Sequence, residues 1–442
     1  MSSDPARLLA FDVLRAVADR DAYANLELSR LLRERGLVGR DAAFATELVS
    51  GTLRMQGTYD AVLDSLADRS LDPPVRDALR LGTHQLLSMR VPPHAAVATT
   101  VSLVRARVGH RPAGFVNAVL RKVAADDLGG WTARLAPEPV TDRPGYLAVA
   151  YSHPRWVVEA LANALGRPGE LADLLAADNA PAKVTLVALP GLAEVAELPG
   201  RPHAVSPYAV ELDAGDPGAL PPVREGRVGI QDAGSQLVAL ALAEAPVEGR
   251  DEHWLDICAG PGGKTALLAA LAARRDARVL AAERQPHRAA LVVAGTRATR
   301  AGLAGVVAAD GTVPPWTPGT FDRVLVDAPC SGLGALRRRP ESRWRRRPED
   351  IAVLVPQQRV LLGAACDAVR PGGVVVYATC SPVAEETSEV VGAVLAGRTG
   401  VRLEPLVGPP DSACPRLPGA VQLWPHRHGT DAMFLALLRR RG

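Results

Sequence analysis

The fold is decided by the stretch Val324-Leu325-Val326-Asp327-Ala328-Pro329-Cys330-Ser331-Gly332, in which an apolar run passes into a loop that carries a cysteine. A second stretch of the same kind is Val374-Val375-Val376-Tyr377-Ala378-Thr379-Cys380-Ser381-Pro382. Upstream, residues 254–264 read Trp-Leu-Asp-Ile-Cys-Ala-Gly-Pro-Gly-Gly-Lys, an apolar run and a glycine-rich loop that we expect to open a helix at Thr265. Ligands of an open α/β sheet bind outside the carboxyl ends of its strands. The three strand ends therefore predict one site.

Short apolar runs alternate with helical patterns from Gly229 to the C-terminus, and this alternation predicts parallel βα units. Runs rich in valine, leucine and alanine are typical of strands covered on both faces of a sheet. We therefore predict an α/β, Rossmann-like domain over residues 229–442. Its expected strands are His253–Ile257, Arg278–Ala282, Gly305–Ala309, Phe321–Val326, Val374–Ala378 and Met433–Leu438.

Two further domains are predicted ahead of this one. Residues 1–135 are predicted to be all-helical, because apolar residues recur at helical spacing up to about residue 125. Glycines and prolines between 126 and 146 indicate a linker. Residues 146–228 are predicted to form a small α+β domain, in which the stretch from Leu189 to Pro222 cannot be assigned well. Its expected elements are helices at Trp156–Leu165 and Leu171–Ala177 and a strand at Val184–Ala188.

Composition and cysteine usage limit the class of protein. The chain has 442 residues, of which 48% are hydrophobic, so it can bury several cores. It has no apolar run of the roughly 18 to 20 residues that a membrane helix needs, and charged residues interrupt its first fifteen positions. Five cysteines occur without a CxxC spacing, which argues against a disulfide framework and against a zinc site. We expect a cytoplasmic protein with free thiols, no metal and no membrane partner, and by default a monomer.

Each of the first five predicted strands ends beside a residue that can do chemistry. The second, third and fourth ends carry Glu283, Asp310 and Asp327, and the fifth carries Cys380. An acid about 20 residues beyond a glycine loop is placed to accept hydrogen bonds from ribose hydroxyls. A single acid after a strand is more often a helix cap or a turn residue, and Asp310 suits either role. The loop matches neither GxxxxGK[ST] nor GxGxxG, so a nucleoside cofactor without phosphates, such as S-adenosylmethionine, fits best.

A cluster of arginines lies between the two cysteines, and only Glu341 opposes it. Positive charge of this density is typical of a surface that binds phosphates. The alternative is a solvated helix face, because the chain as a whole uses arginine in place of lysine. We favour the phosphate-binding interpretation. The cluster comprises Arg337, Arg338, Arg339, Arg343, Arg345, Arg346 and Arg347.

Several motifs resemble those of the RNA cytosine-C5 methyltransferases of the Sun/Fmu type. The resemblance covers nearly the whole chain and is weakest between 185 and 225. The N-terminal likeness is to the NusB-like helical domain of the bacterial enzymes that modify small-subunit rRNA. The matching segments are the glycine loop 258–264, Asp327–Ser331, Thr379–Ser381, Ile230–Gln236 at the entry to the catalytic domain, the basic segment Arg338–Trp344 and, in the N-terminal part, Phe115–Arg121.

The resemblance implies a domain order and an activity. It implies a NusB-like RNA-binding domain at 1–135, an RRM-like domain at 146–228 and an S-adenosylmethionine-dependent methyltransferase domain at 229–442. The implied reaction forms 5-methylcytosine in RNA, with small-subunit (16S) rRNA as the expected substrate.

The reaction explains why two thiols are wanted. Cytosine C5 is a weak nucleophile, and a thiolate that adds to C6 makes C5 reactive, which is covalent catalysis. By the resemblance, Cys380 is this nucleophile, Cys330 assists release, and Asp327 contacts either the cytosine edge or the cofactor. The cofactor contacts implied are Cys258, Ala259, Gly260, Pro261, Gly262, Gly263, Lys264, Glu283, Asp310 and Asp327, and the RNA contacts implied are Arg337, Arg338, Arg339 and Arg343.

Other interpretations remain open from the sequence. Buried cysteines are common small core residues, and we prefer this interpretation for the side chains of Cys258, Cys366 and Cys414. A second function is a non-enzymatic NusB-like RNA-binding or antitermination factor with a vestigial methyltransferase domain, although an intact glycine loop and two thiols argue against it. A third is a methyltransferase acting on small molecules or protein, which has no need of two cysteines.

The sequence departs from the family pattern at three places. Glu283 stands where aspartate is common, which preserves a carboxylate with a longer reach. Thr387 follows Glu386 where asparagine is frequent, and we assign no role there. Asp431-Ala432-Met433-Phe434 replaces the more usual Asp-Gly-Phe-Phe.

Overall fold

The chain forms two compact units in the computed structural model, which describes residues 4–68 and 70–441. Residues 1–3, 69 and 442 belong to predicted domains and lie outside the described residues. We call the two parts the helical unit and the sheet unit. Within the described residues, the helical unit comprises Met1–Glu159, Gly169–Ala180 and Leu336–Arg345, and the sheet unit comprises Ala160–Pro168, Pro181–Ala335 and Arg346–Gly442.

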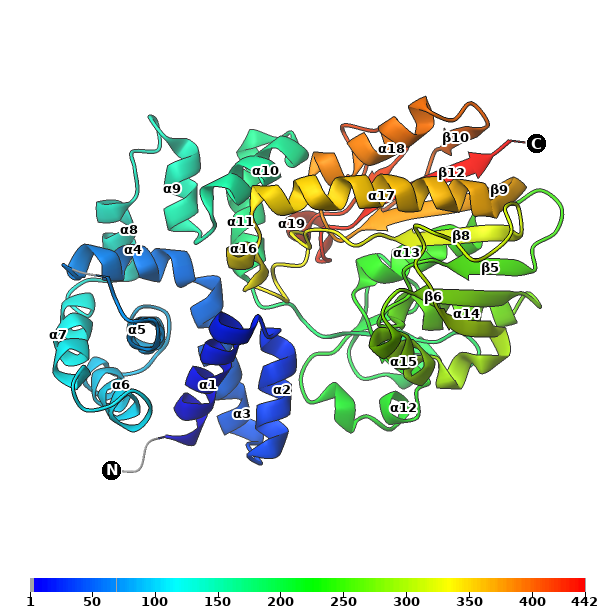
Figure 1. Cartoon of the computed structure of the whole chain (residues 1–442). Helices are drawn as coiled ribbons and strands as arrows, with labels where there is room; N and C mark the ends of the chain where they lie inside the picture. The colour runs from blue at the N-terminus through cyan, green and yellow to red at the C-terminus, as the bar shows by residue number, and fades with distance from the viewer. Residues whose placement is uncertain (1–3, 69, 442) are drawn as a thin grey trace. The chain divides into compact units, whose positions relative to one another are not determined.

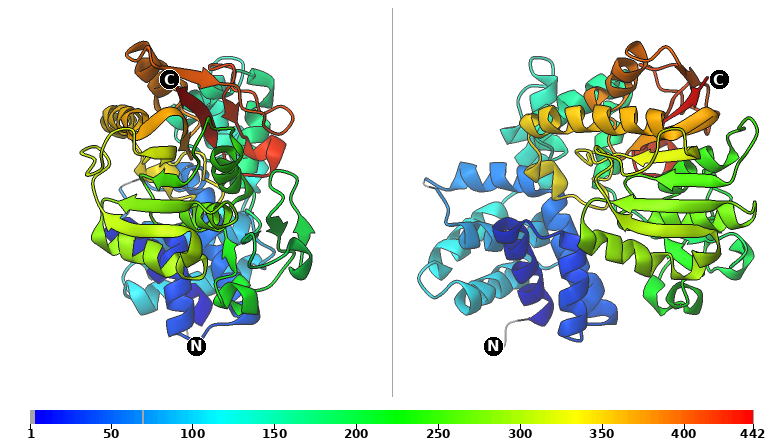
Figure 2. Two further views of the ribbon diagram at one scale, coloured as in Figure 1. Left: turned by 90° about the vertical axis from the view of Figure 1, so that its right-hand side faces the viewer. Right: turned by 45° about the vertical axis from the view of Figure 1, so that its right-hand side comes forward.

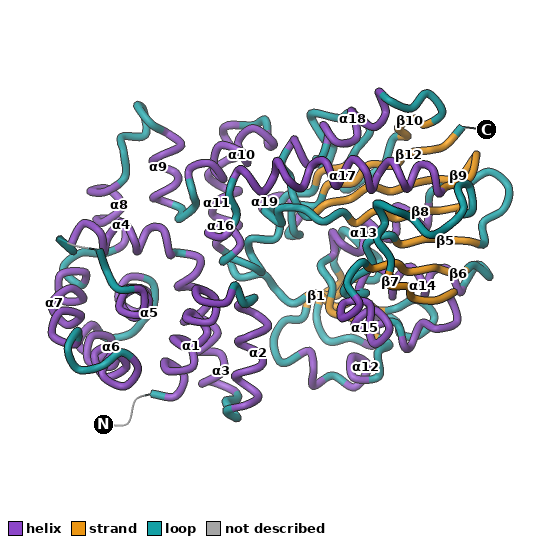
Figure 3. Tube along the Cα trace, viewed as in Figure 1, coloured by secondary structure: helices purple, strands orange, loops and turns teal. Residues whose placement is uncertain are grey.

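The helical unit consists of helices joined by loops, as the apolar spacing predicts (Figure 3). The N-terminus of the first helix is an example of how a helix in this unit begins. Asp4 precedes a proline at the first helical position, and its carboxylate accepts the backbone N–H of Arg7 at 3.0 Å. The apolar faces of the helices share one core. The first seven helices are α1 (Pro5–Arg20), α2 (Ala24–Glu34), α3 (Gly39–Arg54), α4 (Gln56–Leu66), α5 (Pro73–Leu87), α6 (Pro93–Arg107) and α7 (Ala113–Val123).

The linker predicted between 126 and 146 is wrong, because this stretch contains α8 (Leu128–Leu135) and the start of α9 (Arg143–Ala150). Asp127 caps α8 by accepting the N–H of Gly130 at 2.8 Å. Trp131 is buried in the core of the unit and donates to the carbonyl of Val123 at 3.0 Å. Capping and one buried aromatic side chain therefore outweigh the low helix propensity of the two glycines.

The stretch 146–228 contains the predicted helices and strand but is divided between the two units. Helix α11 (Leu171–Asn179) belongs to the helical unit, α10 (Arg155–Leu165) crosses the division, and β1 (Thr185–Ala188) belongs to the sheet unit. The segment that the sequence left unassigned contributes short strands and α12 (Pro221–Arg224). They form an antiparallel sheet in the order β2 (Arg201–Pro202), β3 (Ala209–Glu211), β1 and β4 (Val228–Ile230).

The main sheet of the sheet unit is mixed and has the strand order β10-β12-β9-β8-β5-β6-β7, with β11 paired to β12. Strands β9, β8, β5, β6 and β7 are parallel neighbours, and β12 runs antiparallel to β9. The six predicted strands are confirmed, and β10 and β11 are short additions at the edge. The strands are β5 (His253–Asp256), β6 (Arg278–Glu283), β7 (Leu303–Ala308), β8 (Phe321–Asp327), β9 (Val369–Thr379), β10 (Val401–Glu404), β11 (Val421–Gln422) and β12 (Phe434–Arg440).

Helices cover both faces of this sheet (Figures 1 and 2). Side chains alternate along β8, so Leu325 enters the core shared with α13 (Ala233–Glu244) and α14 (Gly263–Ala273). Its neighbours Val324 and Val326 enter the opposite core, which α17 (Pro348–Ala368) and α18 (Ser388–Ala396) complete. The Rossmann-like prediction is confirmed. Among the described helices, none combines the length and the apolar character required to cross a bilayer.

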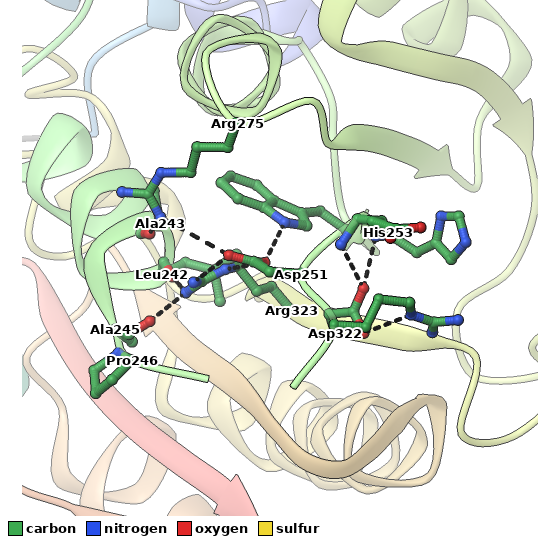
Figure 4. Close-up of polar contacts among 12 residues, drawn as sticks. Leu242, Ala243, Ala245, Pro246, Asp251, His253, Arg275, Asp322 and Arg323 are labelled. Atoms are coloured by element: carbon green, nitrogen blue, oxygen red, sulfur yellow. Dashed lines mark hydrogen bonds and ion pairs between the residues drawn. The ribbon is translucent and has the colours of Figure 1, made fainter. Parts of the chain in front are cut away.

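Paired buried charges align the strands at the edge where β5 and β8 begin (Figure 4). Arg323 is buried and binds both carboxylate oxygens of Asp251 at 2.7 Å. Asp322, also buried, accepts the backbone N–H of His253 at 2.7 Å. A buried charge without a partner is costly, so these pairs hold β5 in register with β8 and leave the opposite edge free for chemistry.

The segment Leu336–Arg345, which carries the predicted RNA-binding arginines, packs within the helical unit. Arg343 is fully buried, and its guanidinium donates to Oδ1 of Asn179 at 2.7 Å and to the carbonyl of Ser152 at 3.0 Å. Burial lowers the pKa of Arg343 to about 10. A guanidinium enclosed in this way does not reach a phosphate. We therefore correct the interpretation of Arg343, which is a structural residue of the helical unit.

Replacement of Arg343 tests this correction. We expect Arg343→Ala to lower the free energy of unfolding by about 3 kcal/mol, because it leaves buried acceptors unpaired and a cavity. The midpoint of thermal unfolding should fall by about 6 °C or more. The exposed Arg347→Ala is the control and should change stability by less than about 0.5 kcal/mol. An unchanged midpoint in Arg343→Ala would contradict the structural role.

Candidate active site

The two cysteine loops leave the same edge of the sheet because β8 and β9 are parallel neighbours. Their register pairs Asp327 with Ala378, just before Cys330 and Cys380 respectively. The backbone N–H of Ala328 donates to the carbonyl of Ala378 at 2.9 Å and carries the pairing beyond the end of β8. Strand β5 lies on the other side of β8, so the glycine loop opens at this edge as well. The strand ends meet as the sequence predicts.

The two predicted thiols are in contact. Their Sγ atoms lie 3.5 Å apart, and both residues are partly exposed. Gly334 braces the first loop against the second, because its N–H donates to the carbonyl of Cys380 and its own carbonyl accepts the N–H of Ala432, each at 2.8 Å. A Cβ at this position would lie 2.2 Å from the carbonyl oxygen of Ala432. Only glycine allows the approach.

The two thiols differ in their tendency to ionise. The hydrogen bond with Cys330 lowers the pKa of Cys380 below its ordinary value, against burial and the charge of Asp327, which both raise it. The same hydrogen bond, together with burial, raises the pKa of Cys330 well above its ordinary value. Cys380 therefore ionises first while Cys330 keeps its proton. Because the thiolate is the nucleophilic form of cysteine, these pKa directions fit Cys380 as the nucleophile, a role that stays a prediction.

A half-buried ion pair acts on the charge of Cys380. Nζ of Lys264, at the start of α14, is 2.7 Å from Oδ2 of Asp327 at the end of β8. Burial lowers the pKa of Lys264, but the charge and hydrogen bond of Asp327 raise it by more, so the net direction is upward. The ammonium group thus remains charged and lowers the pKa of Cys380, whereas the carboxylate of Asp327 raises that pKa by more.

Glu283 and the glycine loop form a cradle that suits a nucleoside. The carboxylate of Glu283 is buried at the end of β6 and accepts the backbone N–H groups of Gly260 at 3.1 Å and Gln285 at 3.0 Å. A Cβ on Gly260 would lie 2.2 Å from Oε2 of Glu283, and Gly262 has a φ of 111°. The positive φ favours glycine at 262, and a side chain at 260 would displace the carboxylate of Glu283. A carboxylate beside closely approaching backbone fits the ribose of S-adenosylmethionine.

Two other predicted cofactor residues have local roles. One oxygen of Asp310 accepts the N–H of Thr312 at 2.9 Å and its hydroxyl at 2.6 Å, and the hydroxyl bond lowers the pKa of Asp310. Asp310 therefore has the turn role that the sequence left open. Its second carboxylate oxygen takes no part in these two hydrogen bonds. Burial raises the pKa of Cys258 well above its ordinary value. The thiol of Cys258 therefore stays neutral. Cys258 can contact a cofactor through its backbone.

Sequence analysis missed two buried acids at this edge. Asp256 ends β5, accepts the hydroxyl of Thr265 at 2.7 Å, and has its pKa raised to about 7 by burial. Glu386 lies between the loops of the two cysteines and is fully buried. A single acid inside an apolar run could have indicated Asp256, whereas Glu386 directly follows Glu385 and has no such signal.

The predicted RNA contacts belong to the helical unit. Arg337, Arg338 and Arg339 lie in the segment that packs within the helical unit. Arg339 is exposed, and its guanidinium carbon is 5.0 Å from the ring centre of Tyr23. Their contact with RNA stays a prediction, whereas Arg343 is buried as described above.

The chain is similar to known methyltransferases along nearly its whole length. A family model described as 16S rRNA methyltransferase RsmB/F matches residues 241–439, and the NusB family model matches residues 4–125. A putative methyltransferase of Mycobacterium tuberculosis is 53% identical over 99% of this chain and 97% of its own length. A probable ribosomal RNA small subunit methyltransferase B of Synechocystis is 33% identical over 98% of this chain and 99% of its own length.

Solved structures share the fold. The crystal structure of PH0851 has a TM-score of 0.81 at 23% identity and covers 100% of both chains. NSun6 from Pyrococcus horikoshii has a TM-score of 0.57 at 18% identity and covers 65% of this chain and 98% of its own. The fold and the site define a methyltransferase. The chain belongs to the 16S rRNA methyltransferase RsmB/F family and carries a NusB-family domain in its N-terminal part.

Removal of one thiol tests the electrostatics of the other. Cys330→Ala deletes the donor that lowers the pKa of Cys380, so we expect that pKa to rise. The measurement is the rate of iodoacetamide alkylation of Cys380, followed by mass spectrometry over a neutral to alkaline pH series. The midpoint of the pH dependence of this rate should move to higher pH in Cys330→Ala. It should move by less in Cys330→Ser, which keeps a donor. Equal midpoints in the wild type and Cys330→Ala would contradict the assignment.

Proposed function

We propose that this methyltransferase forms 5-methylcytosine in 16S rRNA through a covalent bond between Cys380 and C6 of the target cytosine. The observation that carries the proposal is the contact of two thiols, Cys330 and Cys380, at a distance of 3.5 Å. Transfer of a methyl group to an oxygen or a nitrogen atom needs no thiol, whereas C5 of cytosine must first be activated. The lowered pKa of Cys380 supplies the thiolate for that activation.

The first half of the reaction uses Cys380 and the neighbouring ion pair. The thiolate adds to C6, the electron pair of the C5–C6 double bond moves into the ring, and N3 gains a proton. Asp327, paired with Lys264, is placed to contact either the edge of the cytosine or the cofactor. S-adenosylmethionine, the cofactor of this methyltransferase, supplies the electrophilic methyl group that C5 attacks.

The second half restores the base and the enzyme. A solvent base takes the proton from C5, N3 gives back the proton that it gained, the C5–C6 double bond forms again, and the bond between C6 and the sulfur of Cys380 breaks. The sulfur departs with the bonding electron pair as a thiolate. The thiol of Cys330 donates to this sulfur and stabilises it as a leaving group. This arrangement supports the role of Cys330 in release.

The other proposed contacts follow from the same model. Residues 258–264, Glu283 and Asp310 would hold the cofactor, and the NusB-family domain with Arg337, Arg338 and Arg339 would bind the RNA backbone. The target base must leave its stack before its C6 can meet a sulfur. Family membership does not favour the alternative of a non-enzymatic RNA-binding factor. The cytoplasmic location and the monomeric state expected from the sequence remain predictions.

Two cysteine variants test the roles of the thiols. We expect Cys380→Ala to abolish methyl transfer to RNA, because the thiolate that activates C5 is lost. We expect Cys330→Ala to accumulate a covalent protein–RNA adduct, because release is impaired. Radiolabelled S-adenosylmethionine measures the transfer, and denaturing electrophoresis detects the adduct. Cys366→Ala, in the core on one face of the sheet, is the control and should show neither effect. Methylation at the normal rate by Cys380→Ala would refute the nucleophile.

Substitution of Glu283 tests the cofactor cradle. Loss of a charged hydrogen-bond acceptor for the ribose is worth about 1.5 to 3 kcal/mol, so Glu283→Ala should weaken S-adenosylmethionine binding by about 10- to 100-fold. Titration calorimetry with S-adenosylmethionine alone gives the affinity. Glu252→Ala, exposed at the opposite edge of the sheet, is the matched control. Equal affinity in the Glu283 variant and the wild type would place the ribose elsewhere.

A further inference from the structure

Glu386 is a fully buried carboxylate, at the end of the short 3-10 helix η5 (Ala384–Glu386), whose function the family motifs do not explain. Four neutral donors surround it. Oε1 accepts the backbone N–H of Ser331 at 2.7 Å and Nε2 of Gln358 at 3.1 Å. Oε2 accepts the hydroxyls of Ser331 at 2.5 Å and Ser381 at 2.6 Å. Four donors match the roughly four lone-pair sites of a carboxylate.

The donors identify what this carboxylate holds. Ser331 follows Cys330 directly, and Ser381 follows Cys380 directly. The carboxylate therefore joins the backbone beside one thiol to the side chain beside the other. The two serines are 50 residues apart in the sequence. Their distance in space is therefore set by interactions that bridge the two loops, such as the hydrogen bonds of Glu386.

Other hydrogen bonds keep the carboxylate itself in place. The phenol of Tyr377, on the strand that leads to Cys380, donates to the carbonyl of Glu386 at 2.7 Å. Nε2 of Gln358 also donates to the carbonyl of Pro329 at 2.9 Å, immediately before Cys330. These contacts tie Glu386 to both cysteine segments at more than one point. A rotation of either loop would break several hydrogen bonds together.

We propose that Glu386 is a positioning residue that holds the loops of Cys330 and Cys380 together, so that one thiol donates to the other. The effect on catalysis rests on the proposed function, but the effect on the distance between the sulfurs does not. A carboxylate buried among neutral donors is costly to desolvate, and without it the backbone N–H of Ser331 and the hydroxyl of Ser381 would lose their acceptor. A group bonded in this way acts on geometry and touches neither RNA nor cofactor.

The charge of Glu386 has a second consequence for the pair. The hydrogen bond with Cys380 and burial are the main causes of the raised pKa of Cys330, and the charges of Cys380 and Glu386 add to them. The carboxylate thus helps Cys330 to keep the proton that it donates. The thiol pair stays polarised in one direction, with Cys380 as the acceptor.

Truncation and isosteric replacement separate position from charge. Glu386→Ala removes all four acceptor contacts. Glu386→Gln keeps the shape, because its carbonyl accepts from Ser331 N–H and Gln358 while its amide donates to the two serine hydroxyls, which rotate. Glu385→Ala, on the exposed neighbour, is the matched control. If Glu386→Ala does not fold, Ser381→Ala, which removes one donor and keeps the carboxylate, decides the question.

The first measurement is the distance-sensitive chemistry of the two thiols in the full-length protein. In glutathione buffers, one glutathione disulfide oxidises Cys330 and Cys380 to an intramolecular disulfide and releases two glutathione thiols. We expect Glu386→Ala to lower the effective concentration of the pair by about 10-fold or more, since loops that separate lose this proximity. Glu386→Gln should stay within a few-fold of the wild type. Ser381→Ala should fall between them, and Glu385→Ala should match the wild type.

The second measurement is methyl transfer to RNA. We expect kcat to fall by about 100-fold in Glu386→Ala, with KM for RNA and the affinity for S-adenosylmethionine unchanged. Glu386→Gln should recover most of that loss. An effective thiol concentration in Glu386→Ala equal to that of the wild type would overturn the proposal. If the wild-type protein forms no 5-methylcytosine in RNA, the proposed function is refuted. The thiol measurement then still decides the role of Glu386.

Discussion

Parallel pairing of β8 with β9 is the constraint on which the site depends. The pairing of Asp327 with Ala378 brings the ends of both strands to one edge of the sheet, and the two cysteine loops begin there. Because β5 lies on the other side of β8, the glycine loop opens at the same edge. The order of the strands along the chain reverses between β5 and β8. Ligands of open α/β sheets bind beside such a reversal. Buried charge pairs at the opposite edge, such as Arg323 with Asp251, hold the register.

Within that frame, burial and hydrogen bonding give two identical side chains different properties. The hydrogen bond between Cys330 and Cys380 moves their pKa values in opposite directions. The ammonium group of Lys264 adds a positive charge on the side of Cys380. A nucleophile must ionise, and a group that assists release must keep a proton to donate. The asymmetry therefore fits the roles that family resemblance implies.

The arginine segment shows why charge density alone misleads. The sequence places seven arginines between residues 337 and 347, and each has the same charge. The structure separates them, because Arg343 enters the interior of the helical unit, where it bonds Asn179, while Arg339 stays exposed on Tyr23. Burial of a guanidinium is possible only where acceptors such as the carbonyl of Ser152 face it. Those acceptors come from segments far away in the sequence.

The sequence by itself determined the features that depend on local patterns. Six strands, the helical N-terminal part, the glycine loop and the strand-end thiols follow from apolar periodicity and short motifs, since both are read over a few neighbouring residues. Tertiary structure alone decided the contact of Cys330 with Cys380, the bridging position of Glu386 and the burial of Arg343. Each of these needs partners that lie 50 or more residues apart along the chain. No local pattern encodes such a distance, so packing sets it.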